Sequence, residues 1–219
     1  MGVGGEAKGK KGSRRVLVVV AHPDDETLWG GGTILMHLDW QWSVETLCRA
    51  SDPDRAPRFA RAMARLRARG CMADLDDEPE QTPLDGALLR ETILSLTQGM
   101  RFDLILTHSP RGEYTRHLRH EETGEAVLSL WENAQLSAPE LWMFAYEDGG
   151  RRYRPRPIPG AHRIVTLPRK IWLEKCSIIR DIYGFGAESF EMQAATREEA
   201  FWCFASPADA ARWASAQGQ

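Results

Sequence analysis

The sequence predicts an α/β fold: a Rossmann-like, mostly parallel twisted sheet with helices on both faces. Apolar runs of strand length alternate with stretches of helical periodicity along the 219 residues, as in a doubly wound sheet. A hydrophobic content of 42% is enough for one substantial core, so one domain is favoured over two. Polar clusters follow two of the predicted strands, and ligands of such sheets bind beyond the carboxyl ends of the strands.

The first half of the chain predicts a regular alternation of strands and helices. Residues 16–20 are an unbroken aliphatic run, and apolar side chains recur at helical spacing after each predicted strand. Gly70 stands where a helix is expected to end, a common place for glycine. The predicted strands are 15–20, 43–48, 71–75 and 103–107, and the predicted helices are 29–40, 58–69 and 85–98.

The second half is less regular. Segment 147–159 contains two glycines, four arginines and three prolines, which predicts an exposed loop. Pro168 precedes an apolar periodic stretch and suits the first turn of a helix. The other predictions are an irregular segment 108–118, helices 119–136, 168–183 and 208–216, and strands 141–146, 163–167 and 201–204.

Composition narrows the function classes. A net charge of −3 is no basis for binding a polyanion, so a nucleic-acid partner is not expected. No apolar run reaches the roughly 20 residues that span a bilayer, and residues 1–13 form a Gly/Lys-rich flexible tail without a signal-peptide core. We therefore expect a cytoplasmic protein with no membrane partner. The four cysteines contain no CxxC pair, and assembly into a homo-oligomer stays open.

The segment Ala-His-Pro-Asp-Asp-Glu at 21–26 directly follows the first predicted strand. Three carboxylates beside an imidazole concentrate negative charge at one strand end, and these carboxylates repel one another unless a positive charge lies between them. A divalent metal is the obvious candidate. Asp24 and Asp25 would also suit a simple helix N-terminus, although that interpretation does not explain the whole run.

This motif, with Gly-Gly-Gly-Thr at 30–33 and His-Leu-Arg-His at 117–120, closely resembles the PIG-L/LmbE-like family of zinc-dependent N-acetylglucosaminyl deacetylases. The resemblance is clearest over 16–127 and implies a single deacetylase domain at 14–219. It implies a hydrolase that removes the N-acetyl group from an N-acetylglucosamine-type amino sugar or its conjugate, with Zn²⁺ as cofactor.

The resemblance also implies roles for individual residues. His22, Asp25 and His120 are expected to bind zinc, a set of three that leaves a position for water, as in catalytic zinc sites. Asp24 is expected to be the general base. His117, one helical turn before His120, is expected to stabilise the oxyanion or protonate the leaving amine.

Substrate contacts are expected from Arg58 and Tyr114, which align with a sugar-binding arginine and a tyrosine of the family. The chain departs from the family pattern at Leu118-Arg119, where Pro-Asp is usual, which removes an acidic neighbour of the histidines. A glutamate expected three residues after Arg58 is Arg61 here.

Several interpretations stay open. The glycines at 30–32 lack G-x-G-x-x-G spacing and are as well explained by close helix packing as by phosphate binding. His108 either supports the site or has no role in it, and the arginines of 151–156 either bind an anionic substrate group or form a solvated surface. Two other functions remain: hydrolysis of a non-sugar or mycothiol-like amide, and metal or nucleotide binding without turnover.

Overall fold

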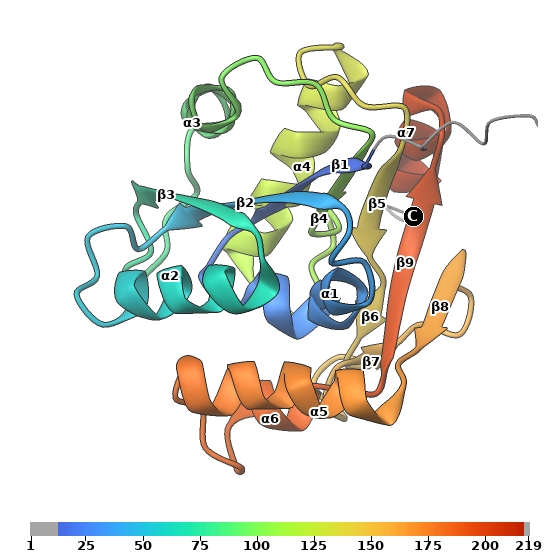
Figure 1. The fold of residues 1–219 in the computed structure, drawn as a ribbon. Helices are drawn as coiled ribbons and strands as arrows, with labels where there is room; N and C mark the ends of the chain where they lie inside the picture. Colours follow the sequence, from blue (N-terminus) through green and yellow to red (C-terminus); the bar gives the residue numbers. More distant parts are fainter. Residues whose placement is uncertain (1–12, 217–219) are drawn as a thin grey trace, which may run out of the picture.

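The computed structural model describes residues 13–216; apart from Ser13, the predicted tail lies outside them. A seven-stranded sheet with the order β3-β2-β1-β4-β5-β9-β8 crosses the molecule (Figure 1). Its first five strands are parallel, and β9 and β8 complete it in antiparallel pairing. This confirms the predicted α/β class. The strands are β1 (Arg15–Val20), β2 (Gln41–Cys48), β3 (Arg69–Leu75), β4 (Leu104–Thr107), β5 (Leu141–Phe144), β8 (Arg163–Thr166) and β9 (Glu198–Phe204).

Helices cover both faces of the sheet, as predicted (Figure 1). In β1, Val16 and Val18 pack into the core layer of α1 and α2, whereas Leu17 and Val19 pack into the layer of α3 and α4. Each such side chain, once fully buried, contributes about 1.5–3 kcal/mol. The helices are α1 (Asp25–Met36), α2 (Arg55–Leu66) and α5 (Arg169–Ser177) on one face, and α3 (Gly86–Thr97), α4 (Leu118–Glu132) and α7 (Pro207–Ala216) on the other.

The predicted bounds of the first two helices were wrong. α1 begins at Asp25, four residues before the predicted start, because the acidic residues of the motif occupy its first turn, where the helix dipole favours them. α2 ends where Arg67 adopts a left-handed conformation with φ 54°. Gly70 lies in β3 instead, and a Cβ atom there would come within 2.5 Å of Met63 Cγ. Glycine at this position therefore permits close helix packing.

The C-terminal third also differs from expectation. The predicted loop 147–159 contains strand β7 (Arg156–Pro157), which pairs with β6 (Tyr146–Glu147). The predicted helix 168–183 continues past α5 as a π-helical turn, η1 (Ile178–Ile182), and an unpredicted short helix, α6 (Phe190–Ala194), follows. The segment after η1 contributes side chains to the candidate site described below.

The glycine run at 30–32 has a packing role. Gly32 and Thr33 donate their backbone N–H groups to the Glu199 carboxylate of β9 at 2.7 Å, and buried Lys175 of α5 donates to the same carboxylate at 2.8 Å. A Cβ atom on Gly32 would lie 2.3 Å from Leu167 Cδ1. This close approach explains the glycine without phosphate binding.

The sheet order brings distant loops to one edge. β1 pairs with β2 on one side and with β4 on the other, so the segments that follow these strands emerge side by side. Within residues 13–216, no helix is both long enough and apolar enough to cross a membrane.

Candidate metal centre

The turn after β1 presents the motif side chains at the carboxyl edge of the sheet. The backbone N–H of His22 donates to Asp25 Oδ2 at 2.9 Å, which closes a tight turn into α1. Asp24, at the centre of that turn, has φ 130°, a value that residues other than glycine rarely adopt. Its N–H donates to buried Glu26 Oε2 at 3.0 Å, so the surrounding structure holds the strained residue in place.

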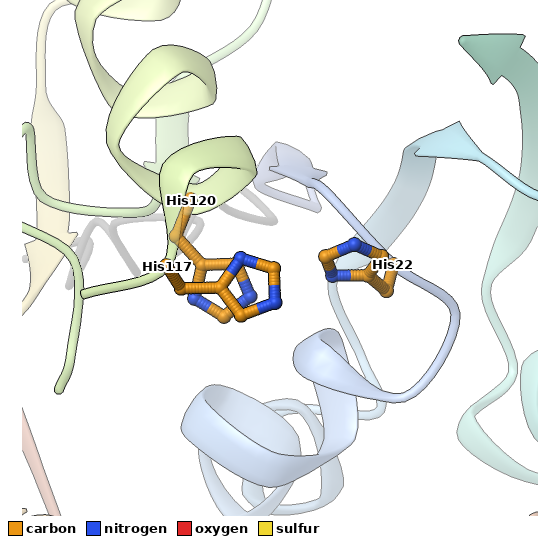
Figure 2. A group of neighbouring side chains, drawn as sticks. All are labelled: His22, His117 and His120. Atoms are coloured by element: carbon orange, nitrogen blue, oxygen red, sulfur yellow. The ribbon is translucent and has the colours of Figure 1, made fainter. Parts of the chain in front are cut away.

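The structure brings the three expected metal ligands together. Asp25 Oδ2 lies 3.2 Å from His22 Nδ1 and 3.2 Å from His120 Nε2. Burial disfavours the charged form of Asp25, but the imidazoles of His120 and His108 hold its pKa well below the usual range. Figure 2 shows His22 facing the paired rings of His117 and His120 across a gap. One ionised carboxylate and two imidazoles therefore converge on a single point.

Two buried nitrogens of this cluster have no hydrogen-bond partner: His120 Nε2 and His117 Nδ1. Ligand atoms of His22, His117 and His120 lie within 4.8 Å of one another. Unsatisfied buried nitrogens are rare in folded proteins; a cation would satisfy a lone pair on His120 Nε2, and a substrate oxygen would satisfy an N–H on His117 Nδ1. The His/carboxylate set is the one that zinc prefers, so the residues fit a catalytic divalent metal.

Two carboxylates contact the imidazoles of the expected ligands His120 and His22 on the side away from Asp25. His120 Nδ1 lies 2.7 Å from Glu113 Oε2, and His22 Nε2 lies 3.0 Å from Asp77 Oδ1. Burial opposes ionisation of both carboxyls, but the adjoining imidazoles lower the pKa of each to about 2. Metal-binding histidines commonly donate their second nitrogen in this way, which fixes the ring and makes it a stronger ligand.

Neither carboxylate was assigned a metal-centre role from the sequence. Glu113 supplies the acidic neighbour that the Leu118-Arg119 departure was expected to remove. It also contacts His108 Nδ1 at 2.9 Å, and His108 Nε2 accepts the N–H of Ala21 at 3.1 Å. His108 thus supports the site. The sequence feature that could have identified Glu113 and Asp77 is their position in loops that follow predicted strands.

Asp24 lines the cavity beside the ligands. Burial, and after it the charge of neighbouring Asp25, raises the pKa of Asp24 well above its usual range. A carboxylate whose proton affinity is raised is better suited to accept a proton than an ordinary surface aspartate.

His117 lies just before α4, with extended backbone (φ −123°), within the segment 108–118 that was predicted to be irregular. Its ring stacks on that of His120 with centroids 4.1 Å apart. Burial, followed by the His120 and His22 imidazoles, lowers the pKa of His117 to about 3. His117 is therefore a neutral imidazole near neutral pH.

A cavity of about 560 Å³ opens over these residues. Tyr114, expected to contact substrate, lies on its wall with its ring 5.7 Å from that of His117 and 4.9 Å from that of Phe190. Burial, followed by the charge of Asp25, raises the pKa of Tyr114, so its phenol keeps its proton.

Arg58 does not line this cavity. It forms an ion pair with Asp54 at 2.8 Å and donates to the Ile182 carbonyl at 3.1 Å. Arg55, one helical turn earlier, lines the cavity instead, and its buried Nη1 has no hydrogen-bond partner. Arg55 of α2 is therefore among the cavity-lining residues, and Arg58, three residues further along the same helix, is not.

Comparison with known proteins gives a family match over more than half of the chain. The PIG-L model, described as GlcNAc-PI de-N-acetylase, matches residues 17–131. A search of curated proteins gives no match.

Solved structures share the fold at low identity. An N,N'-diacetylchitobiose deacetylase from Pyrococcus horikoshii is 16% identical with a TM-score of 0.67 and covers 88% of this chain and 84% of its own. A 4-carboxy-2-hydroxymuconate hydratase from Pseudomonas putida is 18% identical, with a TM-score of 0.60 and coverage of 84% and 83%. A zinc-inhibited form of teicoplanin deacetylase is 14% identical, with a TM-score of 0.55 and coverage of 83% and 84%. Because a hydratase and deacetylases share this architecture, the fold alone does not select the reaction.

Proposed function

The chain belongs to the PIG-L family of de-N-acetylases, and on that premise we propose that it hydrolyses the acetamide of an N-acetylglucosamine-type amino sugar or its conjugate. We take residues 14–219 as one deacetylase domain. The observation that carries the proposal is the convergence of His22, Asp25 and His120 on one point, with two imidazole nitrogens of the cluster left unpartnered.

His22 Nδ1, Asp25 Oδ2 and His120 Nε2 would hold the metal, and we assign zinc because two imidazoles and one carboxylate form a zinc donor set. A bound divalent ion supplies Lewis acidity, which makes a water molecule more acidic and polarises a carbonyl group. The carboxylates of Asp77 and Glu113 keep both imidazoles oriented.

Asp24 is the proposed general base. It takes a proton from the attacking water and then transfers that proton to the nitrogen of the departing amine. Its raised pKa suits both directions of transfer. Acetate and a free amine are the products.

His117 and Tyr114 are the proposed donors to the acetamide oxygen as it gains negative charge. The lowered pKa of His117 makes it a neutral imidazole, which retains one ring N–H, and the raised pKa of Tyr114 keeps its phenol protonated. Neutral donors held in place stabilise developing charge without reorganisation. Protonation of the amine thus falls to Asp24 instead of His117.

Substrate hydroxyl groups are proposed to bind Arg55, whose Nη1 is unpartnered, and the apolar face of the sugar is proposed to pack on Phe185 and Phe190. Arg55 takes the role that the sequence assigned to Arg58. Its guanidinium carbon lies 4.7 Å from the Phe185 ring centroid, which fixes its direction.

The test is acetate release from N-acetylglucosamine, its disaccharide and glycosyl conjugates. Chelator-treated protein is compared with protein given one equivalent of zinc and with protein given excess zinc, because a deacetylase of this fold is known in a zinc-inhibited form. We expect no acetate release from chelator-treated protein and acetate release after one equivalent of zinc is added. Release from a non-sugar amide alone would contradict the substrate class, and bound zinc without any release would contradict the reaction.

A further inference from the structure

Arg119 is buried to an unusual degree for an arginine. It is only 1% exposed, and its guanidinium makes four hydrogen bonds. Nε donates to the Asp76 carbonyl at 2.6 Å, and Nη2 donates to Asp76 Oδ2 at 3.2 Å. Nη1 donates to the Thr82 carbonyl at 3.1 Å and to Glu122 Oε2 at 2.7 Å. A charge is buried only when it is so partnered, which suggests a defined task.

These contacts anchor residues 76–84, which connect β3 to α3 without regular structure and form one wall of the cavity. Arg119 holds the segment at Asp76 and Thr82, and Glu122 Oε1 accepts the backbone N–H of Leu84 at 2.8 Å. Arg119 and Glu122, near the start of α4, therefore hold both ends of the wall 76–84 by hydrogen bonds.

The wall carries Asp77, whose Oδ1 accepts the Nε2–H of His22 and the side-chain amide of Gln81. Asp77 directly follows Asp76, to which Arg119 donates two hydrogen bonds. His120, the other imidazole ligand, follows Arg119 directly in α4. Arg119 thus connects the element bearing one ligand to the carboxylate that orients the other.

We propose that Arg119 is a positioning residue that holds the wall 76–84 so that Asp77 orients the His22 imidazole for metal binding. This inference rests on the proposed function only in taking the ligands to bind a metal. Losing such an orienting contact weakens metal affinity by about 10- to 100-fold. Arg119, which stands where the family usually has aspartate, therefore supports the metal site, and its presence does not indicate that the site has lost its function.

The first experiment is a double-mutant cycle on zinc affinity, measured by competition with a chromophoric chelator. Arg119→Met and Asp77→Ala are each expected to weaken zinc binding by about 10- to 100-fold. Because Arg119 acts through Asp77, the double variant should bind zinc within about threefold of Asp77→Ala. Losses that multiply, or an Arg119→Met variant with wild-type affinity, would overturn the proposal.

Arg116→Met is the matched control, because Arg116 is an exposed arginine of the same segment whose hydrogen bonds go to Glu121. Its zinc affinity should equal that of the wild type. Arg119→Lys is the second variant in case Arg119→Met does not fold. A single ammonium cannot reach all four acceptors, so we expect an intermediate loss, and unchanged affinity would count against the proposal.

A metal-free readout separates this inference from the proposed function. In protein without metal, Arg119→Met should speed hydrogen exchange of the 76–84 amides and change the ¹⁵N shifts of the His22 ring, while those of His162 stay unchanged. Unaltered exchange and His22 shifts would overturn the role of Arg119 whether or not the protein proves to be a deacetylase. If Arg119→Met shows these effects but zinc-loaded wild-type protein releases no acetate, only the proposed function is rejected.

Discussion

At Asp24, backbone strain and carboxyl chemistry occur in the same residue. Its φ of 130° turns the chain sharply out of β1 and places the side chain on the cavity wall, while burial and Asp25 raise its pKa. Strain of this kind costs about 1–3 kcal/mol and persists where the surrounding contacts enforce it. Here those contacts include the Glu26 carboxylate, which accepts the Asp24 N–H and the Tyr183 hydroxyl.

Asp24→Asn should lower the turnover number by about 10²- to 10⁴-fold and leave zinc affinity within a few-fold of wild type. Asparagine has the same shape and tolerates positive φ, but it does not accept the proton of water. Steady-state kinetics and zinc titration measure the two effects. Asp85→Asn is the control, since Asp85 is an exposed N-cap that asparagine can replace. Retained turnover in Asp24→Asn would reject this residue as the base.

Glu45 predicts a pH dependence of stability that is separate from catalysis. It is buried in β2, its Oε2 has no partner, and burial raises its pKa from 4.5 to about 8. The folded state therefore holds this proton after the unfolded state has lost it. As a result, Glu45 lowers stability progressively as pH rises from 4.5 to about 8, by up to about 1.4 kcal/mol per pH unit.

Glu45→Gln should remove this contribution: its melting temperature should match that of wild type near pH 4.5 and exceed it at pH 8. Thermal unfolding of both proteins across this range is the measurement. A difference in melting temperature between variant and wild type that is the same at every pH would show that Glu45 is not the source of the pH dependence.

At the scale of elements, α1 depends on a close approach that its glycines permit. Glu199 of β9 takes two backbone N–H groups of α1, and the Tyr146 hydroxyl donates to the Trp29 carbonyl of the same helix at 3.2 Å. The helix that begins with Asp25 is thereby fixed against β9 and β6. The position of Asp25, the expected metal ligand, depends on this packing.

Gly32→Ala should destabilise the fold by about 1–3 kcal/mol, because its Cβ would overlap fully buried Leu167. Urea unfolding measures the change. Gly86→Ala is the matched helical control: its Cβ would meet only the Arg90 guanidinium at 3.2 Å, so its stability should stay within about 0.5 kcal/mol or rise. Equal effects of both substitutions would contradict a specific packing role for Gly32.

At the scale of the molecule, the candidate metal centre joins segments that are distant in the chain. His22 lies in the turn after β1 and Asp25 is the first residue of α1, whereas His120 lies on α4, on the opposite face of the sheet. A bound ion would connect these elements, and a ligand that binds only the folded state stabilises it.

Zinc at about 1,000 times its dissociation constant should therefore stabilise the protein by about 4 kcal/mol, which corresponds to roughly a 10 °C rise in melting temperature. Differential scanning calorimetry with and without chelator measures the shift. Mg²⁺ should raise the melting temperature only slightly, because it prefers oxygen ligands. His120→Gln should abolish the rise caused by zinc. A zinc shift that survives His120→Gln would place the ion elsewhere.

The sequence alone was sufficient for the α/β class, the core strands and the candidate ligand motif. Strand periodicity and the His-Pro-Asp-Asp turn are local, so neighbouring residues specify them whatever the rest of the chain does. Helix ends were less predictable, because Arg67 rather than Gly70 ends α2 and a close contact with Met63 determines where glycine is needed.

Tertiary structure alone decided which side chains complete the centre. Glu113 and Asp77 orient His120 and His22, and Arg55 rather than Arg58 faces the cavity. Glu113 and Asp77 lie in loops, where the spacing of residues along the chain does not predict which side chains meet. Arg55 and Arg58 lie on one helix, where a shift of three residues changes the direction of a side chain. The sequence indicated the chemistry of the centre because its expected ligands sit in two short motifs, 21–26 and 117–120. Their orientation depends on packing between segments that meet only in the folded protein.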